Sequence, residues 1–348
     1  MAGAPEDPCL AELGEWRLIE RLAAFAPPGQ FLDDAALLTA PGTLVVNTDV
    51  LVDGVHFSDA TTDGAAAGWR TAAANLSDLA AMGCTEVIGL TVGLVAPGQT
   101  RWSWVEGVYR GLLACLQAHG GTLLGGDCSA GLQRMLAVTA LGRLAVDGTG
   151  EACAIRRGAG RPGDVLVSSG PHGLSRLGLA LLQQDLAADL EARLPPGLTQ
   201  RARQCHRHPV PRLDVVADLH ASRPAQRPWR VAGTDSSDGL AAAAAAIARE
   251  SGCRALLDRD RLPLDPAMAW LPQALAWCLS GGEDFELVLA LEDDWADALI
   301  ARLPGCQRIG QLTEKHDDDP AVAWLGGPAA GPDQLPAPEL GGGYRHFG

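Results

Sequence analysis

Carboxylates follow short apolar runs along the whole chain, where the backbone is expected to turn. Asp49 ends one apolar run, Asp127 follows two glycines at the end of another, and the acidic stretches 235–239 and 281–284 have the same character. Oxygen ligands without accompanying histidine or cysteine are the donors that Mg²⁺ prefers. Two carboxylates about 4 Å apart repel by roughly 4 kcal/mol, so a converging set needs bridging cations or protons. The sequence therefore predicts one site that gathers divalent cations.

The lysine content restricts how a phosphorylated ligand could be bound. Lys315 is the only lysine, and it lies in a charged stretch with no glycine-rich loop before it. A P-loop lysine and a protein-kinase lysine are therefore excluded. The stretch 158–163 reads G-A-G-R-P-G, but it precedes an expected strand and contains proline, whereas a dinucleotide fingerprint follows a strand. Metal ions or arginine must neutralise any phosphate.

The composition describes a globular protein with an acidic surface. The chain has 348 residues, of which 47% are hydrophobic and 20% charged, enough for two domains. Its net charge of -15 argues against nucleic acid and anionic membranes as partners. No signal peptide and no apolar run of membrane-spanning length are visible. Nine cysteines without a Cys-x-x-Cys pair indicate small core residues in a reducing, cytoplasmic compartment.

Hydrophobic periodicity and turn signals divide the chain into alternating elements. The first half predicts helices over 12–26, 65–82 and 102–119, and strands over 44–46, 87–95, 122–124 and 135–141. After a turn-rich seam at 146–163, the second half predicts helices over 174–186 and 240–250, strands over 164–169, 285–291 and 309–312, and a surface connection over 189–211. The expected fold is α/β with mixed sheets, in two domains of residues 1–148 and 149–348.

One predicted helix carries polar residues on an otherwise apolar segment. Asn75 and Asp78 are three residues apart, so they share a face of the helix over 65–82. A carboxylate close to the core needs a partner, which must be arginine, backbone N–H or a cation. We expect Asp34, Asp49, Asp78, Asp127 and Asp235 to converge around such cations.

A series of motifs in order resembles a known family. They are D-D-A-A-L-L at 33–38, N-T-D at 47–49, G-V-H-F at 54–57, N-L-S-D-L-A-A-M-G at 75–83, G-G-D at 125–127, S-D-G-L at 237–240, L-S-G-G-E-D-F-E-L at 279–287 and G-Y-R-H-F at 343–347. Together they closely resemble the thiamine-monophosphate kinases, of the aminoimidazole ribonucleotide synthase superfamily, over residues 12–347. The strings at 75–83 and 279–287 are long and specific, whereas the isolated aspartates are not.

The resemblance implies an activity, a fold and a set of ligands. It implies the two-domain fold of aminoimidazole ribonucleotide synthase and a homodimer formed through the N-terminal domain, with the nucleotide near that interface. The implied reaction is direct, in-line, Mg²⁺-assisted transfer of the ATP γ-phosphoryl group to thiamine monophosphate, giving thiamine diphosphate. Because a phosphate monoester with a second pKa near 6 is already mostly dianionic at neutral pH, no catalytic general base is expected.

The resemblance also implies residue roles, motif by motif. The positions that match metal ligands, for several Mg²⁺ ions, are Asp34, Asn47, Thr48, Asp49, Asp78, Asp127, Asp235 and Asp238. Those that match ATP contacts are Gly126, Asp127, Arg156 and Ser237, with Ser236 as the alternative to Ser237. Those that match contacts to the thiamine substrate are His56, Glu283 and Tyr344, whose ring could hold the thiazolium cation.

Two departures from the family pattern keep other readings open. Phe31 and Leu32 replace glycine before the Asp-Asp pair, and the stretch after Asp127 begins with Cys128 and lacks the usual arginine. Arg134 is the candidate substitute for that arginine. The alternatives are a related ATP-dependent enzyme with another acceptor and a non-catalytic homologue that binds metal or nucleotide.

Overall fold

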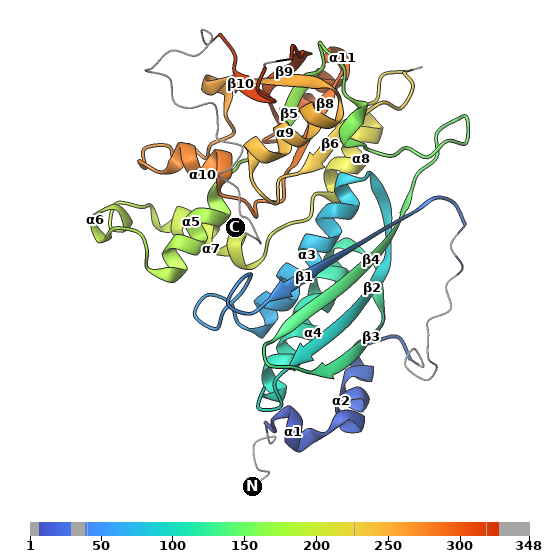
Figure 1. Cartoon of the computed structure of the whole chain (residues 1–348), viewed down its shortest axis with the longest axis vertical. Helices are drawn as coiled ribbons and strands as arrows, with labels where there is room; N and C mark the ends of the chain where they lie inside the picture. The colour runs from blue at the N-terminus through green and yellow to red at the C-terminus, as the bar shows by residue number, and fades with distance from the viewer. Residues whose placement is uncertain (1–6, 29–38, 40, 226, 318, 327–348) are drawn as a thin grey trace. The chain divides into compact units, whose positions relative to one another are not determined.

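The chain forms two compact units that are each built on one β-sheet. The structure is a computed structural model, which describes residues 7–28, 39, 41–225, 227–317 and 319–326. One unit comprises residues 1–79 and 86–144, and the other comprises 80–85 and 145–348 (Figure 1). The predicted mixed α/β class is confirmed. Among the described residues, no helix combines the length and apolarity needed to cross a bilayer.

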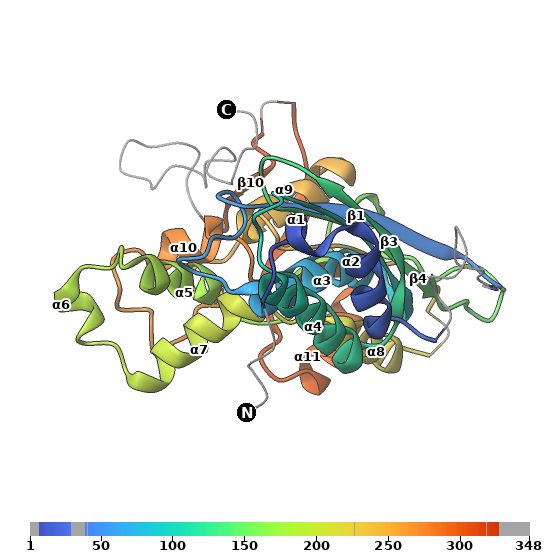
Figure 2. The same ribbon diagram turned by 90° about the horizontal axis from the view of Figure 1, so that it is seen from below.

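The first unit is a four-stranded sheet with two long helices. Its strands run in the order β1-β4-β2-β3, with bounds β1 Leu44–Val52, β2 Cys84–Ala96, β3 Thr122–Ala130 and β4 Met135–Leu144. β1 is antiparallel to β4, and β2 is parallel to β3. The helices α3 (Gly64–Ala81) and α4 (Trp102–His119) lie on the same side of this sheet (Figure 2). β1 is therefore an edge strand, paired on one side only among the described strands.

The beginning of the described chain differs from the expectation of one helix over 12–26. The structure has α1 (Leu10–Leu13), α2 (Glu15–Leu22) and a 3₁₀ turn, η1 (Ala23–Phe25). Gly14 separates α1 from α2 because its φ of +73° is not helical. The single predicted helix is therefore wrong. Of the apolar positions that its periodicity indicated, Leu13 and Leu22 are buried, whereas Trp16 is 85% exposed.

The helices α3 and α4 contact each other through backbone at glycines. A Cβ on Gly68 would lie 1.9 Å from the Val108 carbonyl oxygen, and one on Gly111 would lie 1.9 Å from the Ala65 carbonyl oxygen. Gly64 and Gly107 lie in the same crossing. No side chain therefore separates the two helices there.

Replacing Gly111 with alanine should lower the free energy of unfolding by about 1–3 kcal/mol, because the added methyl group overlaps backbone that cannot rotate away. Urea denaturation followed by circular dichroism measures this loss. Gly197→Ala is the matched control, since Gly197 is helical but a Cβ there meets nothing within 4 Å. An equal loss in both variants would contradict the packing argument.

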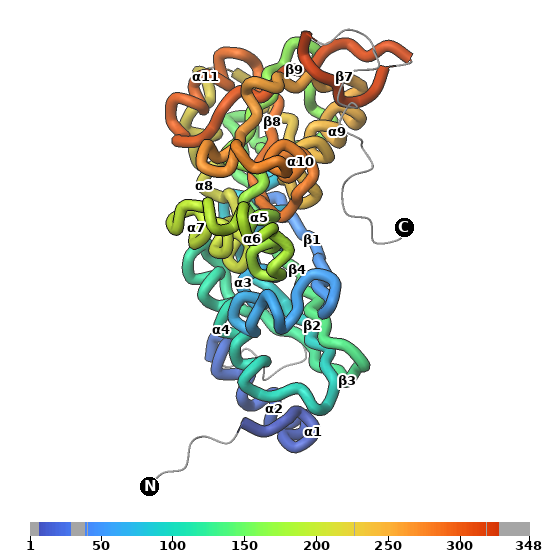
Figure 3. The backbone as a smooth tube through the Cα atoms, turned by 90° about the vertical axis from the view of Figure 1, so that its left-hand side faces the viewer, coloured from blue at the N-terminus to red at the C-terminus, as the bar shows by residue number. Residues whose placement is uncertain are grey.

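The second unit is a six-stranded sheet with helices on both faces. Its strands run in the order β10-β7-β9-β5-β8-β6, with bounds β5 Val165–Ser168, β6 Ala232–Asp235, β7 Cys253–Leu257, β8 Leu287–Leu291, β9 Gln307–Glu314 and β10 Val322–Trp324. α9 (Leu240–Glu250) contributes to one apolar core, and α8 (Leu213–Ser222) and α11 (Asp293–Arg302) contribute to another. Figure 3 shows α8 and α11 on one side of β8 and α9 on the other.

A smaller helical cluster extends this unit. It comprises α5 (Leu174–Gln183), α6 (Ala188–Glu191), α7 (Pro196–Arg207) and α10 (Ala274–Ser280), and its core includes Leu177, Leu198 and Ala202. The remaining described helices are the 3₁₀ turns η2 (Arg157–Ala159) and η3 (Arg259–Arg261). The prediction that 189–211 is a surface connection is therefore wrong, because α7 fills most of that segment and buries its apolar side.

Candidate functional site

In the first unit, β1 and α3 bring together three of the predicted metal-binding residues. The Asn47 side-chain amide donates to Asp78 Oδ2 at 3.0 Å and to Asn75 Oδ1 at 3.2 Å. The backbone N–H of Asp49 also donates to Asn75 Oδ1, at 3.2 Å. Asn75 is fully buried and fastened to its own helix by a bond from Nδ2 to the Thr71 carbonyl, at 2.9 Å. Asn75 thus ties the strand that carries Asn47 and Asp49 to the helix that carries Asp78.

This cluster has the donor chemistry that a divalent cation needs. The side-chain oxygen of Asn47, Oδ1, is buried and has no hydrogen-bond partner among the described residues. Its orientation is set by the network, because the amide nitrogen faces two acceptor oxygens. Burial also raises the pKa of Asp49, and a bound cation would oppose that rise. A carbonyl oxygen without a donor and nearby carboxylates fit Mg²⁺.

Two other predicted metal ligands of this unit do not join that cluster. Thr48 is exposed, and its hydroxyl lies 2.8 Å from the Thr139 hydroxyl on β4. Asp127 is exposed on β3, and two strands separate β3 from β1, which corresponds to about 14 Å at normal strand spacing. Asp49 and Asp127 lie inside strands, paired with Val138 and Gly93. The expectation that they follow the ends of apolar strands at turns is wrong.

Gly126, a predicted ATP contact, precedes Asp127 on β3. A Cβ there would lie 2.0 Å from the Val92 carbonyl oxygen, so glycine is required by the neighbouring strand. A Cβ on the adjacent Gly125 would meet no atom of the described residues within 4 Å. The structure therefore explains Gly126 by strand packing.

His56 lies in the connection between β1 and α3. Its Nδ1 accepts from the Val52 backbone N–H at 3.1 Å, so the imidazole carries its proton on Nε2 when neutral. Arg70 donates to the His56 carbonyl oxygen at 3.3 Å. These contacts fix both the backbone and the ring of His56.

Arg134 braces the same connection. Its guanidinium donates to Asp53 at 2.7 Å and to Asp59 at 2.8 Å, and it lies 4.7 Å from the centre of the Trp104 ring. The ion pairs raise the pKa of Arg134 although burial opposes this. The structure thus places Arg134 in contacts within the protein and gives no support to it as a substitute phosphate ligand.

In the second unit, two loops bring together Ser237, Asp238 and Glu283. Asp235 is the last residue of β6, and the loop after it leads into α9. The Ser237 carbonyl oxygen accepts from the Glu283 backbone N–H at 2.8 Å. One residue earlier, the Ser236 hydroxyl accepts from the Glu286 backbone N–H at 3.1 Å. The loop with the predicted metal and ATP residues is therefore hydrogen-bonded to the loop with a predicted substrate residue.

Arg156 lies in the segment before η2. Its backbone N–H donates to the Val231 carbonyl oxygen at 3.2 Å, and its side chain is exposed. The next residue, Arg157, donates through Nε to the Thr234 hydroxyl at 3.2 Å, directly before Asp235. The structure therefore places Arg157, which the sequence analysis did not single out, in contact with the end of β6.

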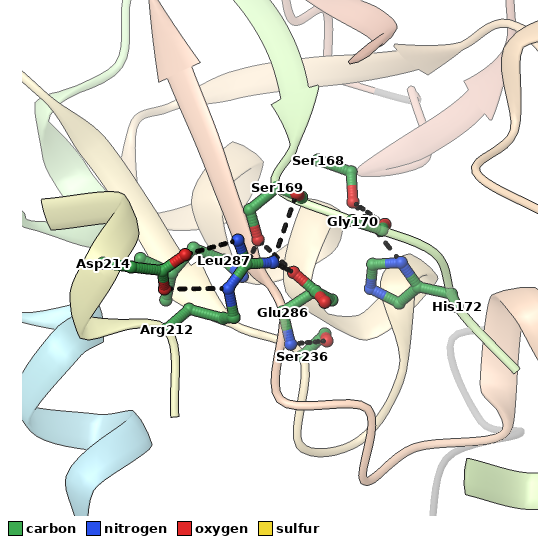
Figure 4. Close-up of polar contacts among 9 residues, drawn as sticks. All are labelled: Ser168, Ser169, Gly170, His172, Arg212, Asp214, Ser236, Glu286 and Leu287. Atoms are coloured by element: carbon green, nitrogen blue, oxygen red, sulfur yellow. Dashed lines mark hydrogen bonds and ion pairs between the residues drawn. The ribbon is translucent and has the colours of Figure 1, made fainter. Parts of the chain in front are cut away.

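A network of polar residues holds the base of these loops (Figure 4). The Glu286 carboxylate accepts from the Ser169 hydroxyl and from Arg212. Arg212 also donates to both carboxylate oxygens of Asp214, at 3.0 and 2.9 Å. Burial raises the pKa of Glu286, and the Arg212 charge opposes that rise. The network joins the segment after β5, the start of α8 and the start of β8.

The predicted residues are thus grouped within units, and some lie outside the described chain. Asn47, Asp49 and Asp78 meet in the first unit, and Asp235, Ser237, Asp238 and Glu283 occupy two bonded loops in the second. Asp34 and Tyr344 lie outside the described residues. Within the described part of the chain, no group of three or more His, Cys, Asp or Glu side chains is placed to hold a metal.

The chain is similar to known proteins of one class. Residues 32–144 match the N-terminal domain of AIR synthase related proteins, and residues 161–322 match the C-terminal domain. A thiamine-monophosphate kinase from Synechococcus elongatus is 48% identical over 89% of this chain and 91% of that relative. The chain belongs to the thiamine-monophosphate kinase family, which confirms the resemblance seen in the motifs.

Solved structures agree with that membership. The crystal structure of thiamine-monophosphate kinase from Stenotrophomonas maltophilia is 33% identical, with a TM-score of 0.73 over 90% of this chain and 96% of that one. The structure of AaThiL complexed with AMPPCP and TMP is 26% identical, with a TM-score of 0.68 over 90% of this chain and 94% of that one. Both share the two-sheet architecture over nearly the whole chain.

Proposed function

We propose that this protein transfers the γ-phosphoryl group of ATP to thiamine monophosphate, giving thiamine diphosphate, with Mg²⁺ as the cofactor. Family membership over nearly the whole chain supports the reaction, and a member that holds AMPPCP and TMP supports the two substrates. The observation within this chain that carries the proposal is the buried Asn47 side-chain oxygen beside Asp78, which has no hydrogen-bond partner in the described part of the chain. A carbonyl oxygen in that state is stabilised by a bound cation.

The residues suit a reaction that depends on positioning and charge neutralisation. Bound Mg²⁺ would neutralise phosphate charge in a chain that has one lysine and otherwise relies on arginine for positive charge. Asn47, Asp49 and Asp78 would hold the metal, with Asn75 fixing their mutual positions. The acceptor phosphate is already mostly dianionic at neutral pH, so the chain needs no group to remove a proton from it.

The remaining roles are proposed from the resemblance. The resemblance also assigns metal binding to Asp34, Thr48, Asp127, Asp235 and Asp238, of which Thr48 and Asp127 lie apart from the cluster around Asn47. We assign ATP binding to Gly126, Asp127, Arg156 and Ser237. We assign binding of thiamine monophosphate to His56, Glu283 and Tyr344.

The deciding experiment mixes the purified chain with ATP, Mg²⁺ and thiamine monophosphate, and measures thiamine diphosphate by chromatography. Product should form, and a chelator in excess over Mg²⁺ should stop it. ATP consumption with another acceptor, but not with thiamine monophosphate, would favour a related enzyme of the same superfamily. Calorimetric binding of ATP and Mg²⁺ without any product would favour the non-catalytic alternative.

We further propose a homodimer formed through the first unit. Three apolar residues of the edge strand β1 are exposed, Leu44 by 42%, Val46 by 64% and Val50 by 41%. A long, apolar edge strand tends to pair with another chain. The nine cysteines, all without disulfides, and the use of ATP favour a cytoplasmic location, and the net charge of -15 disfavours nucleic acid and anionic membranes as partners.

Replacing Val46 with lysine should weaken the dimer at least about tenfold, because a charge would enter the proposed apolar contact. Sedimentation velocity over a concentration series measures the dissociation constant. Leu132→Lys is the control, since Leu132 is fully exposed in the turn between β3 and β4. An unchanged dissociation constant for Val46→Lys would place the interface elsewhere.

A further inference from the structure

The loop between α10 and β8 has a strained backbone. Glu283 and Phe285 have φ values of 58° and 53°, in the left-handed region that residues with a Cβ rarely adopt. Such a conformation is strained, and it persists only where the contacts around the residue impose it. The contacts that impose this conformation therefore indicate which side chain the strained backbone positions.

Asp284, between these two residues, is fastened to the beginning of a helix. Its Oδ2 accepts from the Gly173 backbone N–H at 2.6 Å, and its Oδ1 accepts from the Ser175 backbone N–H at 2.9 Å. These N–H groups belong to the first turn of α5, which has no acceptor within the helix for them. Burial raises the pKa of Asp284 to about 7, and the two N–H groups oppose that rise. Asp284 thus uses both carboxylate oxygens to hold the loop against α5.

A second path of contacts leads from the same helix to the Glu283 carboxylate. Ser175, which binds Asp284 through its backbone, has its hydroxyl 3.3 Å from His206 Nδ1 on α7. His206 is buried, and the same Nδ1 lies 3.7 Å from Glu283 Oε2. The path from Asp284 through Ser175 and His206 therefore returns to the neighbouring residue of Asp284. This is no nucleophilic triad, because the hydroxyl and the carboxylate approach the same ring nitrogen.

We propose that Asp284 is a positioning residue for the substrate site, which fixes the Glu283 carboxylate through Ser175 and His206. This inference rests on the proposed function, in which Glu283 contacts thiamine monophosphate. It goes further by assigning the strain in the loop to the Asp284 carboxylate, whose two oxygens both bind backbone N–H groups of α5. Releasing Asp284 would let Glu283 relax to a negative φ, which would redirect its side chain.

The test compares Asp284→Asn with Glu283→Gln in steady-state kinetics. Asparagine keeps the size of Asp284 but places an NH₂ group against a backbone N–H, so one of the two bonds is lost. We expect both variants to raise the KM for thiamine monophosphate about tenfold and to leave the KM for ATP within about twofold. The double variant should be no worse than Glu283→Gln alone, because positioning has no effect once the positioned carboxylate is gone.

Asp164→Asn is the matched control for loss of a buried carboxylate. Asp164 is buried in the same unit, accepts from the Arg161 backbone N–H at 2.8 Å and pairs with Arg230, but it belongs to neither loop. This variant should lower the melting temperature and leave both KM values unchanged. A rise in both KM values for Asp284→Asn would indicate general loosening and would overturn the inference.

The outcomes distinguish failure of the positioning role of Asp284 from failure of the substrate-binding role of Glu283. If Glu283→Gln leaves the KM for thiamine monophosphate unchanged, the substrate role of Glu283 fails. If Glu283→Gln raises that KM and Asp284→Asn does not, positioning fails while the substrate role stands. Should Asp284→Asn not fold, Ser175→Ala and His206→Asn take its place with the same expected KM pattern, and unchanged KM values in both would overturn the inference.

Discussion

Replacing Asp78 with asparagine is expected to lower kcat by about 100- to 1,000-fold while the chain stays folded. Asparagine has the shape of aspartate, and its Oδ1 can still accept the 3.0 Å bond from Asn47. What it lacks is the negative charge that would bind the cation beside Asn47 Oδ1. Metal-dependent charge neutralisation should therefore be lost while packing is kept. The measurement is kcat as a function of Mg²⁺ concentration.

The aspartate that caps the beginning of the same helix provides the control. Asp63 accepts from the Ala66 backbone N–H at 2.8 Å at the beginning of α3, and asparagine fills such a capping position equally well. Asp63→Asn should keep kcat within about twofold, because it leaves the helix and the cluster intact. Unchanged turnover in Asp78→Asn would remove Asp78 from the metal site.

The largest loss of stability is expected from replacing Arg212 with methionine. The side chains of Arg212 and Glu286 are each only 12% exposed, so the variant leaves a buried carboxylate without its cation. Breaking a buried ion pair in this way costs about 3–5 kcal/mol. Adding Glu286→Gln should recover part of the loss, since the orphaned charge is then removed. The free energy of unfolding in urea measures both effects.

The control for Arg212 is an arginine in an exposed ion pair. Arg308 contacts Asp293 and Asp297, whose side chains are 73% and 65% exposed. Arg308→Met should cost less than about 1 kcal/mol, because water solvates the remaining carboxylates. Equal losses in the free energy of unfolding for Arg212→Met and Arg308→Met would show that burial does not strengthen the contribution of the Figure 4 network to stability.

Elements with clear periodicity were predictable, and those with mixed composition were not. The helices at 102–119 and 240–250 are α4 and α9, because apolar spacing and a glycine after the last turn mark both of them. The strand predicted over 44–46 continues to Val52, because pairing with β4 overrides the polar residues Asn47 to Asp49. Proline and arginine in 189–211 obscured α7, although Pro196 stands where a helix begins.

The sequence motifs contain residues that the structure brings into contact, but they do not indicate how those residues are arranged. The strings at 75–83 and 279–287 contain Asn75, Asp284 and Glu286, but nothing local indicates that Asn75 bonds to β1. No local sequence pattern indicated the ion pair of Arg212 either, because its partner Glu286 is 74 residues away. A correct strand over 44–52 would have separated Thr48 from Asn47 and Asp49, since neighbouring strand residues point to opposite faces.

The glycine crossing of α3 and α4 has a consequence for how the sequence of this chain can change. Side chains at an ordinary helix crossing can adopt new rotamers when a neighbour changes, and so absorb the alteration. Here backbone meets backbone at Gly68 and Gly111, so the crossing offers no such adjustment. Any residue larger than glycine would displace α3 as a whole, and Asn75 and Asp78 would shift with it. Selection on catalysis should thus extend to glycines whose role is to let two helices meet.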